Sequence, residues 1–569
     1  MVEEQSPPFD FQNPPWTKNY DEGVYFKVDV PRILLHEMLK GVTEKYPDRP
    51  AVTFYGKSLS YKELWSEVLK VAEGLRKLGL GEDSCIVLIL PNVPHYIILS
   101  FAAFSIGAKA CLFNPLWSAY QVEEELEKIN PDIIIVQDIL ADKYESVLKN
   151  RNNVYQAFLG DYATMGFRFK MSMGRMLGKL PRPSKLFKPY RELVSNEPLG
   201  KLYDGDPEET VAALLYTGGT TGTPKAVMLT HLNIMANIIY QKIWFHREEG
   251  KDRVLGLLPF FHAYGFGSIM GLSLYIASNL VLQLRFDPEE FLKTIIKERI
   301  TLIPGAPTIY LMLLKHIPRE KLEKIRGIPE ICFSGAAPLP VEVIKRWEYI
   351  TGCRIVEGYG LTETSPVAAA NPIYGKRKHG SIGLPMPNTL LAIADLVEPK
   401  LVEGQGELVV SGLQVMKGYY NMPEENKQAF FDCCGKRWFR TGDIGYMDEE
   451  GYFFIVDRKK DIIKYKGHSV YPRYIEETLY KHECVAEVAV IGIPDPEAGE
   501  TIKAVVSLKP ECRGKLSEEE LKEWSKQYLG AHEYPRFVEF ADELPKSPAG
   551  KILRRVVRER ELEKLKSEH

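Results

Sequence analysis

The sequence alternates short apolar runs with segments of helical periodicity over most of its length, and this pattern limits the fold more than any other feature. Helical periodicity is clear over 61–80 and 289–300, where apolar residues recur every three or four positions. The apolar runs between such segments are the expected strands, at 85–90, 109–113, 132–136, 254–260, 279–284 and 331–335. Strands alternating with helices predict an α/β fold with layered, largely buried parallel sheets.

The pattern changes twice toward the C-terminus. From about residue 380 the strands become shorter and are separated by glycines, which predicts a small β-barrel-like subdomain over about 380–457. After Asp457 comes a compact α+β segment of about 110 residues, a size that can fold as a domain of its own. We therefore predict a large N-terminal domain over 1–457 and a smaller C-terminal domain over 458–569.

Composition excludes several classes of protein. Hydrophobic residues make up 45% of the 569 residues, which is the range of folded globular proteins and excludes wholesale disorder, collagen and coiled coil. The formal net charge is only -3, from 73 cations and 76 anions, so no global basic surface attracts a polyanion. The chain is expected to bind small molecules and no nucleic acid.

The eight cysteines include no C-x-x-C pair, and the adjacent Cys433 and Cys434 lack the spacing of zinc ligands. We interpret all eight as reduced thiols, which indicates a cytoplasmic location. The segment 1–16 carries early acids and prolines where an export signal has cations and then an apolar run. The longest uncharged stretch, 266–284, contains glycines, serines and two amides, which predicts a buried helix followed by a strand.

Residues 162–191 form a basic insert with eight Lys or Arg and no Asp or Glu. Five apolar residues of this insert fall on one face of a helix, namely Met165, Phe169, Met173, Met176 and Leu180. The prolines at 181 and 183 end such a helix. Two interpretations stay open: an interfacial helix that lies on an anionic membrane, or a solvated basic loop with an apolar anchor.

The strongest local signal for chemistry is YTGGTTGTPK at 216–225, directly after the apolar run VAALL. Its glycines let backbone amides approach an anion closely, and its threonine hydroxyls can donate hydrogen bonds to phosphate oxygens. A Walker loop needs Gly before its Lys and Ser or Thr after it, whereas Lys225 lies between Pro224 and Ala226. The segment therefore predicts a phosphate cradle of a different kind.

This segment resembles the phosphate-binding signature of adenylate-forming enzymes, the superfamily of acyl-CoA synthetases, luciferases and peptide-synthetase adenylation domains. Six further segments resemble the family's motifs in the same order: LPFFHAYG at 258–265, SGAAPL at 334–339, EGYGLTE at 357–363, RTGD at 440–443, DRKKDIIKYKG at 457–467 and PKSPAGKILR at 545–554. The segment 13–24 and the basic insert are most similar to long-chain fatty acyl-CoA ligases. The resemblance implies that the C-terminal domain is mobile.

The resemblance also implies an ATP site with Mg²⁺. Thr217 and Glu363 would hold the metal against the phosphates, and Glu363 offers the hard oxygen ligand that Mg²⁺ prefers. Tyr359 offers an aromatic face for adenine, and Asp443, assisted by Arg458, would accept the ribose hydroxyls. The remaining nucleotide contacts implied by the motifs are Gly218, Gly219, Thr220, Thr221, Gly222, Thr223, Lys225, Gly335, Ala336, Ala337, Glu357, Gly358, Gly360 and Thr362.

On the acyl side, the family match implies that four residues line the substrate, namely His262, Phe266, Gly335 and Gly360. Phe266 resembles the position where long-chain enzymes place an aromatic gate. No Asp or Glu occurs over 254–286, so a cationic end of a substrate would lack its partner. This absence favours a plain carboxylic acid.

Two lysines are expected to serve different half-reactions. Lys551 is implied to bridge the acid carboxylate and the ATP α-phosphate during adenylation, whereas Lys464 is implied to act in the second conformation, with CoA. Lys460 matches the hinge about which the C-terminal domain of the family rotates. The loop from Lys464 to Gly467 would enter the site only after that rotation.

These parts fit one reaction, in which a carboxylate attacks the α-phosphorus of ATP to give acyl-AMP and pyrophosphate, and the thiol of CoA then displaces AMP. We expect a long- or medium-chain fatty acid, and an enzyme that is cytoplasmic or peripheral at the inner membrane face. An aromatic or short hydroxy acid is the alternative substrate, and a catalytically silent nucleotide-binding protein is a third interpretation. Acyl chain length and the choice between a monomer and a homodimer stay open.

Overall fold

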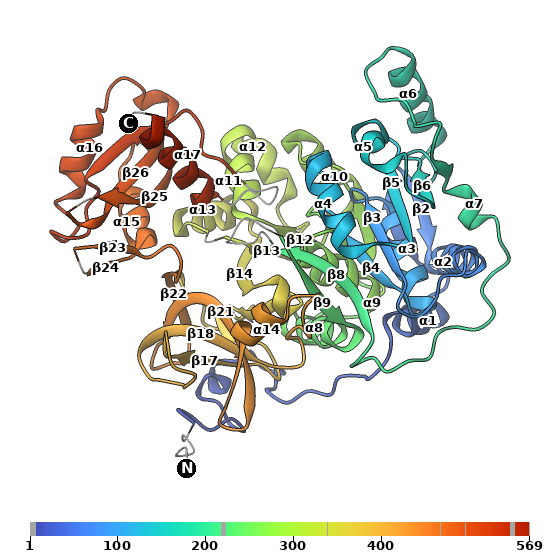
Figure 1. Ribbon diagram of the computed structural model, residues 1–569, viewed down its shortest axis with the longest axis horizontal. Helices are drawn as coiled ribbons and strands as arrows, with labels where there is room; N and C mark the ends of the chain where they lie inside the picture. The colour runs from blue at the N-terminus through green and yellow to red at the C-terminus, as the bar shows by residue number, and fades with distance from the viewer. Residues whose placement is uncertain are drawn as a thin grey trace. The chain divides into compact units, whose positions relative to one another are not determined.

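The computed structural model describes residues 7–217, 224–337, 339–466, 468–495, 497–546 and 552–567 (Figure 1). The chain divides into two compact units, each assembled from segments that are distant in sequence. The larger unit comprises Trp16–Leu390 and Ser411–Gln428, and the smaller unit comprises Met1–Pro15, Leu391–Val410 and Ala429–His569. The predicted α/β class is confirmed, whereas a domain boundary at residue 457 stays a prediction.

Within the described residues, the larger unit contains two mixed sheets. The first has eight strands in the order β19-β9-β8-β4-β3-β5-β6-β7, parallel from β8 to β7 and antiparallel at β9 and β19. Its strands are β3 (Cys85–Ile89), β4 (Lys109–Leu112), β5 (Ile133–Gln137), β6 (Val154–Ala157), β7 (Lys188–Pro189), β8 (Val211–Thr217), β9 (Lys225–Thr230) and β19 (Gly418–Tyr419). Strands β3 and β5 are buried at every residue, as expected for parallel strands covered on both faces.

The second sheet of the larger unit has nine strands over the described residues, in the order β16-β15-β14-β13-β12-β10-β11-β1-β2. It is parallel from β14 to β1 and carries antiparallel strands at both ends. Its strands are β1 (Pro50–Phe54), β2 (Lys57–Ser60), β10 (Arg253–Gly256), β11 (Asn279–Leu282), β12 (Leu302–Gly305), β13 (Ile331–Ser334), β14 (Arg354–Gly360), β15 (Val367–Ala370) and β16 (Leu384–Pro385).

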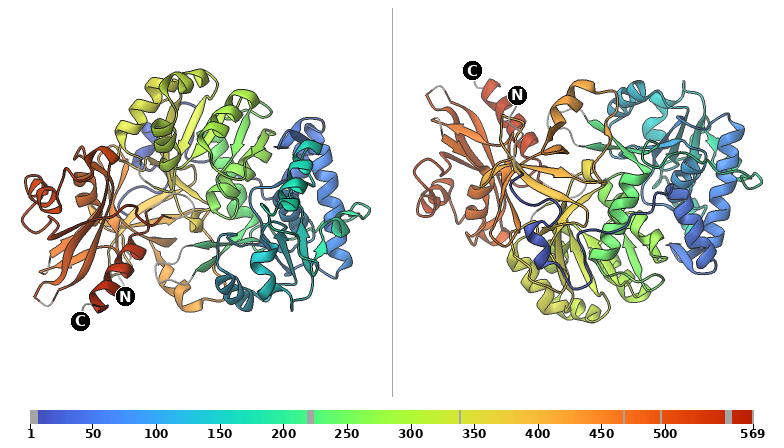
Figure 2. Two further views of the ribbon diagram at one scale, coloured as in Figure 1. Left: turned by 90° about the horizontal axis from the view of Figure 1, so that it is seen from above. Right: turned by 90° about the horizontal axis from the view of Figure 1, so that it is seen from below.

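Several helices of the larger unit follow from sequence signals. Helix α2 (Tyr61–Lys77) begins at a capping box in which Ser60 and Glu63 accept each other's backbone N–H groups. Figure 2 shows α1 (Leu35–Lys45) and α2, in blue, side by side at one edge of this unit. The remaining helices are η1 (Pro15–Asn19), α3 (Pro94–Ser105), α4 (Ala119–Ile129), α5 (Ala141–Leu148), α6 (Met165–Met176), α7 (Arg191–Val194), α8 (His231–Trp244), η2 (Tyr264–Gly271), α9 (Leu272–Tyr275), α10 (Pro288–Glu298), α11 (Pro307–His316), α12 (Arg319–Leu322), η3 (Glu323–Ile325), α13 (Val341–Thr351), η4 (Thr362–Thr364) and α14 (Pro423–Ala429).

The smaller unit contains two five-stranded sheets in its described part. The first joins β17-β18-β21-β20, with β22 paired to β21, and it corresponds to the glycine-separated strands predicted after residue 380. The second joins β24-β23-β26-β25, with β27 paired to β26. The elements are β17 (Leu390–Ala394), β18 (Gln405–Ser411), β20 (Phe430–Cys433), β21 (Lys436–Met447), β22 (Phe453–Arg458), β23 (Ile463–Tyr465), β24 (His468–Val470), β25 (Val485–Asp495), β26 (Gly499–Leu508), β27 (Phe537–Phe540), α15 (Pro472–Leu479), η5 (Pro510–Cys512), α16 (Glu518–Ser525) and α17 (Arg554–Ser567).

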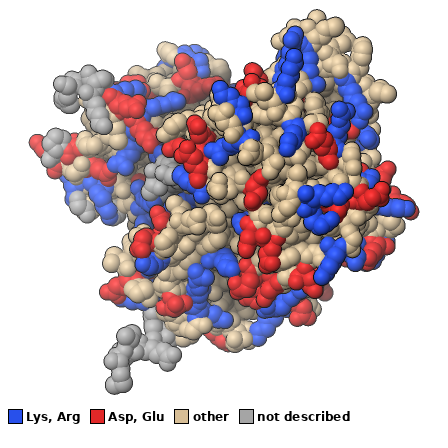
Figure 3. All heavy atoms as spheres, turned by 45° about the vertical axis from the view of Figure 1, so that its right-hand side comes forward, with Lys and Arg blue, Asp and Glu red and all other residues tan. Residues whose placement is uncertain are grey.

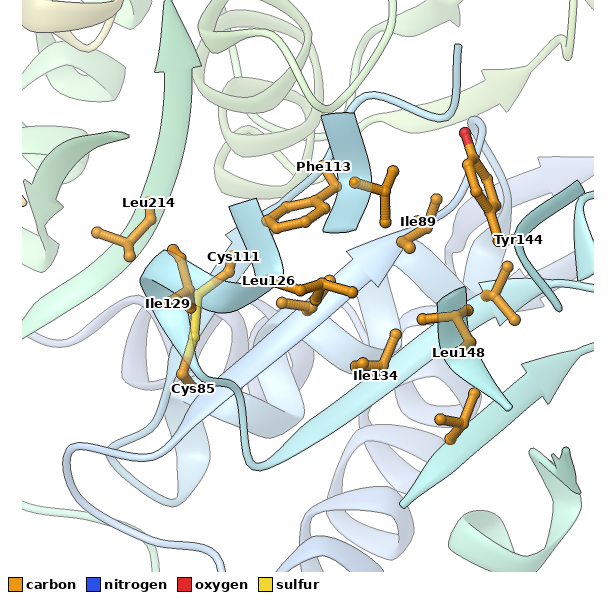
Figure 4. Close-up of a cluster of buried hydrophobic side chains, with 14 of the residues drawn as sticks. Cys85, Ile89, Cys111, Phe113, Leu126, Ile129, Ile134, Tyr144, Leu148 and Leu214 are labelled. Atoms are coloured by element: carbon orange, nitrogen blue, oxygen red, sulfur yellow. A yellow bond between two sulfur atoms is a disulfide. The ribbon is translucent and has the colours of Figure 1, made fainter. Parts of the chain in front are cut away.

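One hydrophobic core of the larger unit lies between the eight-stranded sheet and helices α4 and α5 (Figure 4). Ile89 and Ile134 come from neighbouring parallel strands, and Leu126 and Leu148 come from the two helices. All four side chains are almost completely buried. Burying side chains of this size stabilises a fold by roughly 1.5 to 3 kcal/mol each, so this layer holds the ends of the parallel strands in place.

The prediction that all eight cysteines are reduced is wrong for four of them. Cys85 and Cys111 form a disulfide inside this core (Figure 4), and Cys484 and Cys512 form another in the smaller unit. The parallel pairing of β3 with β4 brings the first two together, although 26 positions separate them. Spacing along the chain cannot reveal such a pair, because the fold sets the distance. The argument from reduced thiols to a cytoplasmic location therefore loses its support.

One other sequence prediction is confirmed. The uncharged stretch 266–284 forms most of the π-helix η2, then α9 and β11, which are largely buried. In the basic insert, for which a helix and a loop were both open, the structure has the helix α6. Among the described residues, no helix combines the length and the apolar character needed to cross a bilayer.

Candidate functional site

The phosphate-binding segment joins two strands of the eight-stranded sheet. Thr217 is the last residue of β8, and it pairs with Lys225, the first residue of the antiparallel strand β9. The glycines and threonines between them, at 218–223, lie outside the described residues. The structure therefore places both ends of the predicted cradle at the end of a hairpin anchored in a buried sheet.

Glu363, the predicted metal ligand, lies beside the ends of this segment. It belongs to η4, which contacts β8 and β9, and it is 8% exposed. The hydroxyl of Tyr419 donates a hydrogen bond to Glu363 Oε1 at 2.9 Å. Lys225 places its Nζ 4.7 Å from the centre of the Tyr419 ring. Thus Lys225, Tyr419 and Glu363 form one connected group next to Thr217.

Burial raises the pKa of the Tyr419 phenol, and the neighbouring Glu363 carboxylate raises it further. The phenol therefore keeps its proton at neutral pH and acts as the donor in the bond to Glu363. This bond occupies Oε1 of the carboxylate and orients the group.

The predicted adenine-binding segments lie on adjacent strands of the nine-stranded sheet. Strand β13 ends at Ser334, which pairs with Glu357 on β14, and Tyr359 pairs with Ala369 on β15. The N–H of Leu339 donates to Glu357 Oε1 at 3.3 Å, which ties the segment after β13 to β14. Gly335, Ala336 and Ala337 follow β13 directly, and Gly358, Gly360 and Thr362 follow along β14 into η4. The structure thus brings these predicted residues together.

Two glycines in this region sit where a side chain would collide with neighbours. A Cβ on Gly360 would lie 2.0 Å from the carbonyl oxygen of Pro366. A Cβ on Gly335 would lie 3.2 Å from the ring of Tyr264. The backbone at these two glycines therefore lies against its neighbours with little room for a side chain.

The residues predicted for the acyl side lie in η2 and in the loop before it. Phe266 lies in η2 and is 2% exposed. A Cβ on Gly267 would lie 2.7 Å from the carbonyl oxygen of Ser365, so η2 packs directly against the segment that follows Glu363. Tyr264 also lies beside Gly335, so residues predicted for the acyl side and for the nucleotide are neighbours in the larger unit.

His262 lies in the loop before η2, and its Nε2 atom is buried without a hydrogen-bond partner among the described residues. Burial lowers the pKa of His262 to about 4. The imidazole is therefore neutral at pH 7 and presents one ring nitrogen for a hydrogen bond with a substrate oxygen. A neutral ring carries no charge that could bind an ammonium group on a substrate. This agrees with the prediction of a plain carboxylic acid without a cationic end.

The smaller unit holds a second set of predicted residues. Asp443 on β21 is 2% exposed and pairs with Arg458 of β22, whose Nε lies 2.9 Å from Asp443 Oδ1. The pairing brings together the two residues assigned to the ribose. Lys460 follows β22 in a turn, and Lys464 on β23 is exposed, with its backbone N–H donating to Glu500 Oε2 at 2.8 Å.

Arg554, three residues after Lys551, joins elements on both sides of the predicted hinge. Its guanidinium contacts Asp457 Oδ1 at 2.9 Å, Asp461 Oδ2 at 3.1 Å and Glu476 Oε2 at 2.5 Å. Asp457 is nearly buried and also accepts the backbone N–H of Arg473. Lys551 and Gly467, both predicted site residues, lie outside the described residues.

Sequence reasoning missed three residues that organise the larger unit's site. Asn92 donates to the carbonyls of Gly256 and Leu258, and its Oδ1 accepts the N–H of Phe260, so it fixes the loop before His262. Tyr264 and Tyr419 are the other two. Tyr264 lies two residues after His262 in the same motif, which offered a signal, whereas Asn92 and Tyr419 lie in segments with no distinguishing pattern.

The donor set fits a magnesium ion. Mg²⁺ is held in proteins by one or two carboxylate or hydroxyl oxygens together with substrate phosphates and water. Glu363 supplies a buried carboxylate, and Thr217 supplies a hydroxyl at the adjacent strand end. No group of three or more His, Cys, Asp or Glu side chains arranged for a metal occurs in the part of the chain that the structure describes.

Family models match two stretches of the chain. The "AMP-binding enzyme" family matches residues 39–420, and the "AMP-binding enzyme C-terminal domain" family matches residues 474–551. The first match covers more than half of the sequence and contains the phosphate-binding segment, His262 and Glu363. The chain therefore belongs to the AMP-binding enzyme family, which confirms the resemblance found in the sequence.

Individual proteins and solved structures are also similar to this chain. The chain is 39% identical to a long-chain-fatty-acid–CoA ligase of Bacillus subtilis, over 96% of this chain and 98% of that protein. It is 32% identical to a feruloyl-CoA synthase of Amycolatopsis, over 90% and 96%. Among solved structures, ATP-bound MatB from Rhodopseudomonas palustris superposes with a TM-score of 0.80 at 26% identity, over 93% of this chain and 99% of that one.

Proposed function

We propose that this protein is an AMP-forming ligase that activates a long- or medium-chain fatty acid and transfers it to CoA. In the first step a carboxylate oxygen bonds to the α-phosphorus of ATP and pyrophosphate leaves. In the second step the CoA sulfur bonds to the acyl carbon, its proton is released and AMP leaves. The observation that carries the proposal is the similarity, over nearly the full length of both chains, to a long-chain-fatty-acid–CoA ligase.

The larger unit would bind and orient the reacting groups. His262 offers a neutral hydrogen-bonding nitrogen near the carboxylate, and Phe266 in η2 serves as an apolar gate for the chain. Backbone amides and hydroxyls of 217–223, with Lys225, would hold the phosphates. Thr217 and Glu363 would hold Mg²⁺, which neutralises phosphate charge when bound. Tyr359 and the glycine-rich backbone around it would receive adenine.

The smaller unit would supply the remaining groups. Asp443 accepts the ribose hydroxyls while Arg458 keeps its carboxylate in place. Lys551 places its ammonium between carboxylate and α-phosphate in the first step, and Lys464 and Gly467 act in the second, after rotation about Lys460. This division corresponds to an N-terminal domain over 1–457 and a mobile C-terminal domain over 458–569.

The substrate class is tested with a panel of acids from acetate to palmitate, together with ferulate. We expect AMP and thioester to form in equal amounts, with palmitate or a medium-chain acid giving the highest kcat/KM. A preference for ferulate would establish the alternative of an aromatic acid, which the similarity to feruloyl-CoA synthase favours. If no acid yields AMP in the presence of ATP and magnesium, the proposed function is wrong.

The same proposal places the enzyme in the cytoplasm, where ATP and CoA are available, with contact to the inner membrane face through 162–191. Association as a homodimer would appear as a doubled molar mass in light scattering.

A further inference from the structure

Helix α6 of the basic insert exposes a row of large apolar side chains. Met165 is 80% exposed, Phe169 66% and Met176 76%, and Leu177 directly after the helix is 58% exposed. In Figure 1, α6 lies at the upper right edge of the larger unit with no other element over its outer side. Isolated exposed apolar residues are common, but a continuous row on one helix indicates a surface that is covered in use.

The opposite side of α6 is fixed to the larger unit. Arg168 donates to the carbonyls of Gly160 and Asp161 at 2.7 and 2.6 Å, and Arg175 forms an ion pair with the fully buried Asp138. Phe167 stacks on Tyr55 with ring centres 4.2 Å apart. The helix is therefore held in one orientation, and its exposed row does not result from a loosely attached loop.

The charged side chains of the insert are all positive. Arg168 and Arg175 are used to anchor α6, which leaves six exposed cations in the same acid-free segment: Lys170, Lys179, Arg182, Lys185, Lys188 and Arg191. Figure 3 shows blue Lys and Arg side chains beside tan uncharged ones on the corresponding projection at the top of the molecule. The surface thus combines apolar side chains with cations that can meet a layer of anions.

A hollow at the end of the same insert has the same charge. It encloses about 430 Å³ and is lined by Lys149, Arg151 and Lys188, with Asn152 and Asn153, and by the exposed side chain of Leu186. No carboxylate lines it. An anionic group can therefore enter the hollow beside an apolar side chain, as a phospholipid headgroup at a bilayer surface would do.

We propose that α6 and the basic chain after it, residues 165–191, form a docking surface for an anionic phospholipid bilayer. Met165, Phe169 and Met176 enter the boundary between headgroups and acyl chains, and the cations contact the lipid phosphates. The binding itself is independent of catalysis. The benefit of docking for the enzyme rests on the proposed function, because a long-chain fatty acid partitions into bilayers and a docked enzyme would bind it there.

The test measures binding of the full chain to vesicles of phosphatidylcholine alone and of phosphatidylcholine with phosphatidylglycerol, at low and high salt. We expect binding to the anionic vesicles and weakening with salt. The triple variant Met165→Ser/Phe169→Ser/Met176→Ser should lose at least about tenfold in affinity, since each side chain contributes apolar burial. Lys179→Gln/Arg182→Gln/Lys185→Gln should lose roughly fivefold per charge.

A matched control replaces two exposed apolar residues elsewhere in the larger unit, Tyr25→Ser/Leu116→Ser, and should bind vesicles like the unaltered chain. Thermal unfolding and AMP formation with octanoate should be unchanged in every variant, because the altered residues are exposed. If the unaltered chain forms AMP but does not bind the anionic vesicles, the docking proposal is wrong and the proposed function stays intact. Equal binding by the triple variant would also overturn it, as would a dimer in solution that this variant abolishes.

Discussion

The two units hold their predicted site residues by different forces. In the larger unit, the site is fixed by close backbone packing around Gly360 and Gly267 and by neutral hydrogen bonds from Asn92. In the smaller unit, ion pairs do most of this work, with Arg554 joined to three carboxylates and Arg458 to Asp443.

This difference predicts different behaviour. Close packing has one low-energy arrangement and is insensitive to salt, because a shifted backbone would collide with its neighbours. Ion pairs are screened by salt and can be exchanged for other partners at modest cost. The proposed site for phosphates and acyl chain would thus be fixed, whereas the contacts in the smaller unit could be exchanged, which suits an enzyme that carries out two steps in sequence.

The largest expected effect comes from Arg554→Ala. It removes the shared partner of Asp457 and Glu476, both nearly buried, and should lower the free energy of unfolding of the smaller unit by roughly 3 to 5 kcal/mol. Denaturant unfolding measures this loss. The neighbouring Arg555→Ala removes only an exposed pair with Glu559 and should cost less than about 1 kcal/mol. Similar losses for the two variants would show that ion pairs do not organise this unit.

The next effect separates the two chemical steps. Lys551→Ala should slow acid-dependent ATP/pyrophosphate exchange about 10²- to 10³-fold, roughly 3 to 4 kcal/mol, because the cation proposed to bridge carboxylate and α-phosphate is lost. Conversion of supplied acyl-AMP and CoA to thioester should persist.

The converse variant is Gly467→Leu, which should obstruct the thiol and leave the exchange reaction intact. Equal loss of both half-reactions in either variant would contradict the assignment of these residues to separate steps.

Lowering the pH should reduce the free energy of unfolding of the larger unit. Burial lowers the pKa of His36 to about 4 and that of His231 to about 3, from an ordinary value of 6.5. The unfolded chain therefore takes up protons first, so stability that is fully present above pH 6.5 is lost as pH falls toward 4. For His36 the loss is about 3 kcal/mol.

The measurement for this prediction is the free energy of unfolding at pH 7, 6, 5 and 4. His36→Gln, which can keep the hydrogen bond to the Tyr203 carbonyl, should flatten the profile. The exposed His316→Gln should leave it unchanged. A flat profile for the unaltered chain would mean that these histidines are not buried as neutral rings.

The smallest effect concerns Tyr419. Tyr419→Phe removes the donor to Glu363 and should lower the free energy of unfolding of the larger unit by about 1 to 2 kcal/mol, since the acceptor is charged and buried. The adjacent Tyr420→Phe is the control and should change stability by less than about 0.5 kcal/mol. If both variants behave alike, the hydrogen bond to Glu363 does not contribute to the site.

Sequence reasoning predicted the strands and the buried helix and strand of 266–284, because these depend on local periodicity. The family motifs marked His262, Asp443 and Arg458, but the pairing of Asp443 with Arg458 across neighbouring strands was not predicted. Sequence reasoning did not find Asn92 or Tyr419, because a long segment of chain separates each from the residues that it positions. The error on Cys85 and Cys111 has the same origin, since strand pairing sets the distance between them. Patterns within about ten residues are read from sequence, whereas contacts made by sheet order are not.

The glycines that line the larger unit's site also limit how it can be redesigned. Side chains on Gly265, Gly267 or Gly360 would run into carbonyl oxygens, at 2.0 Å from Pro259, 2.7 Å from Ser365 and 2.0 Å from Pro366. Directed evolution toward longer or shorter acids therefore has few productive positions on these walls. Phe266 and Ser268 lie in the same helix and already carry buried side chains, so variation at these two positions is where altered substrate range should first arise.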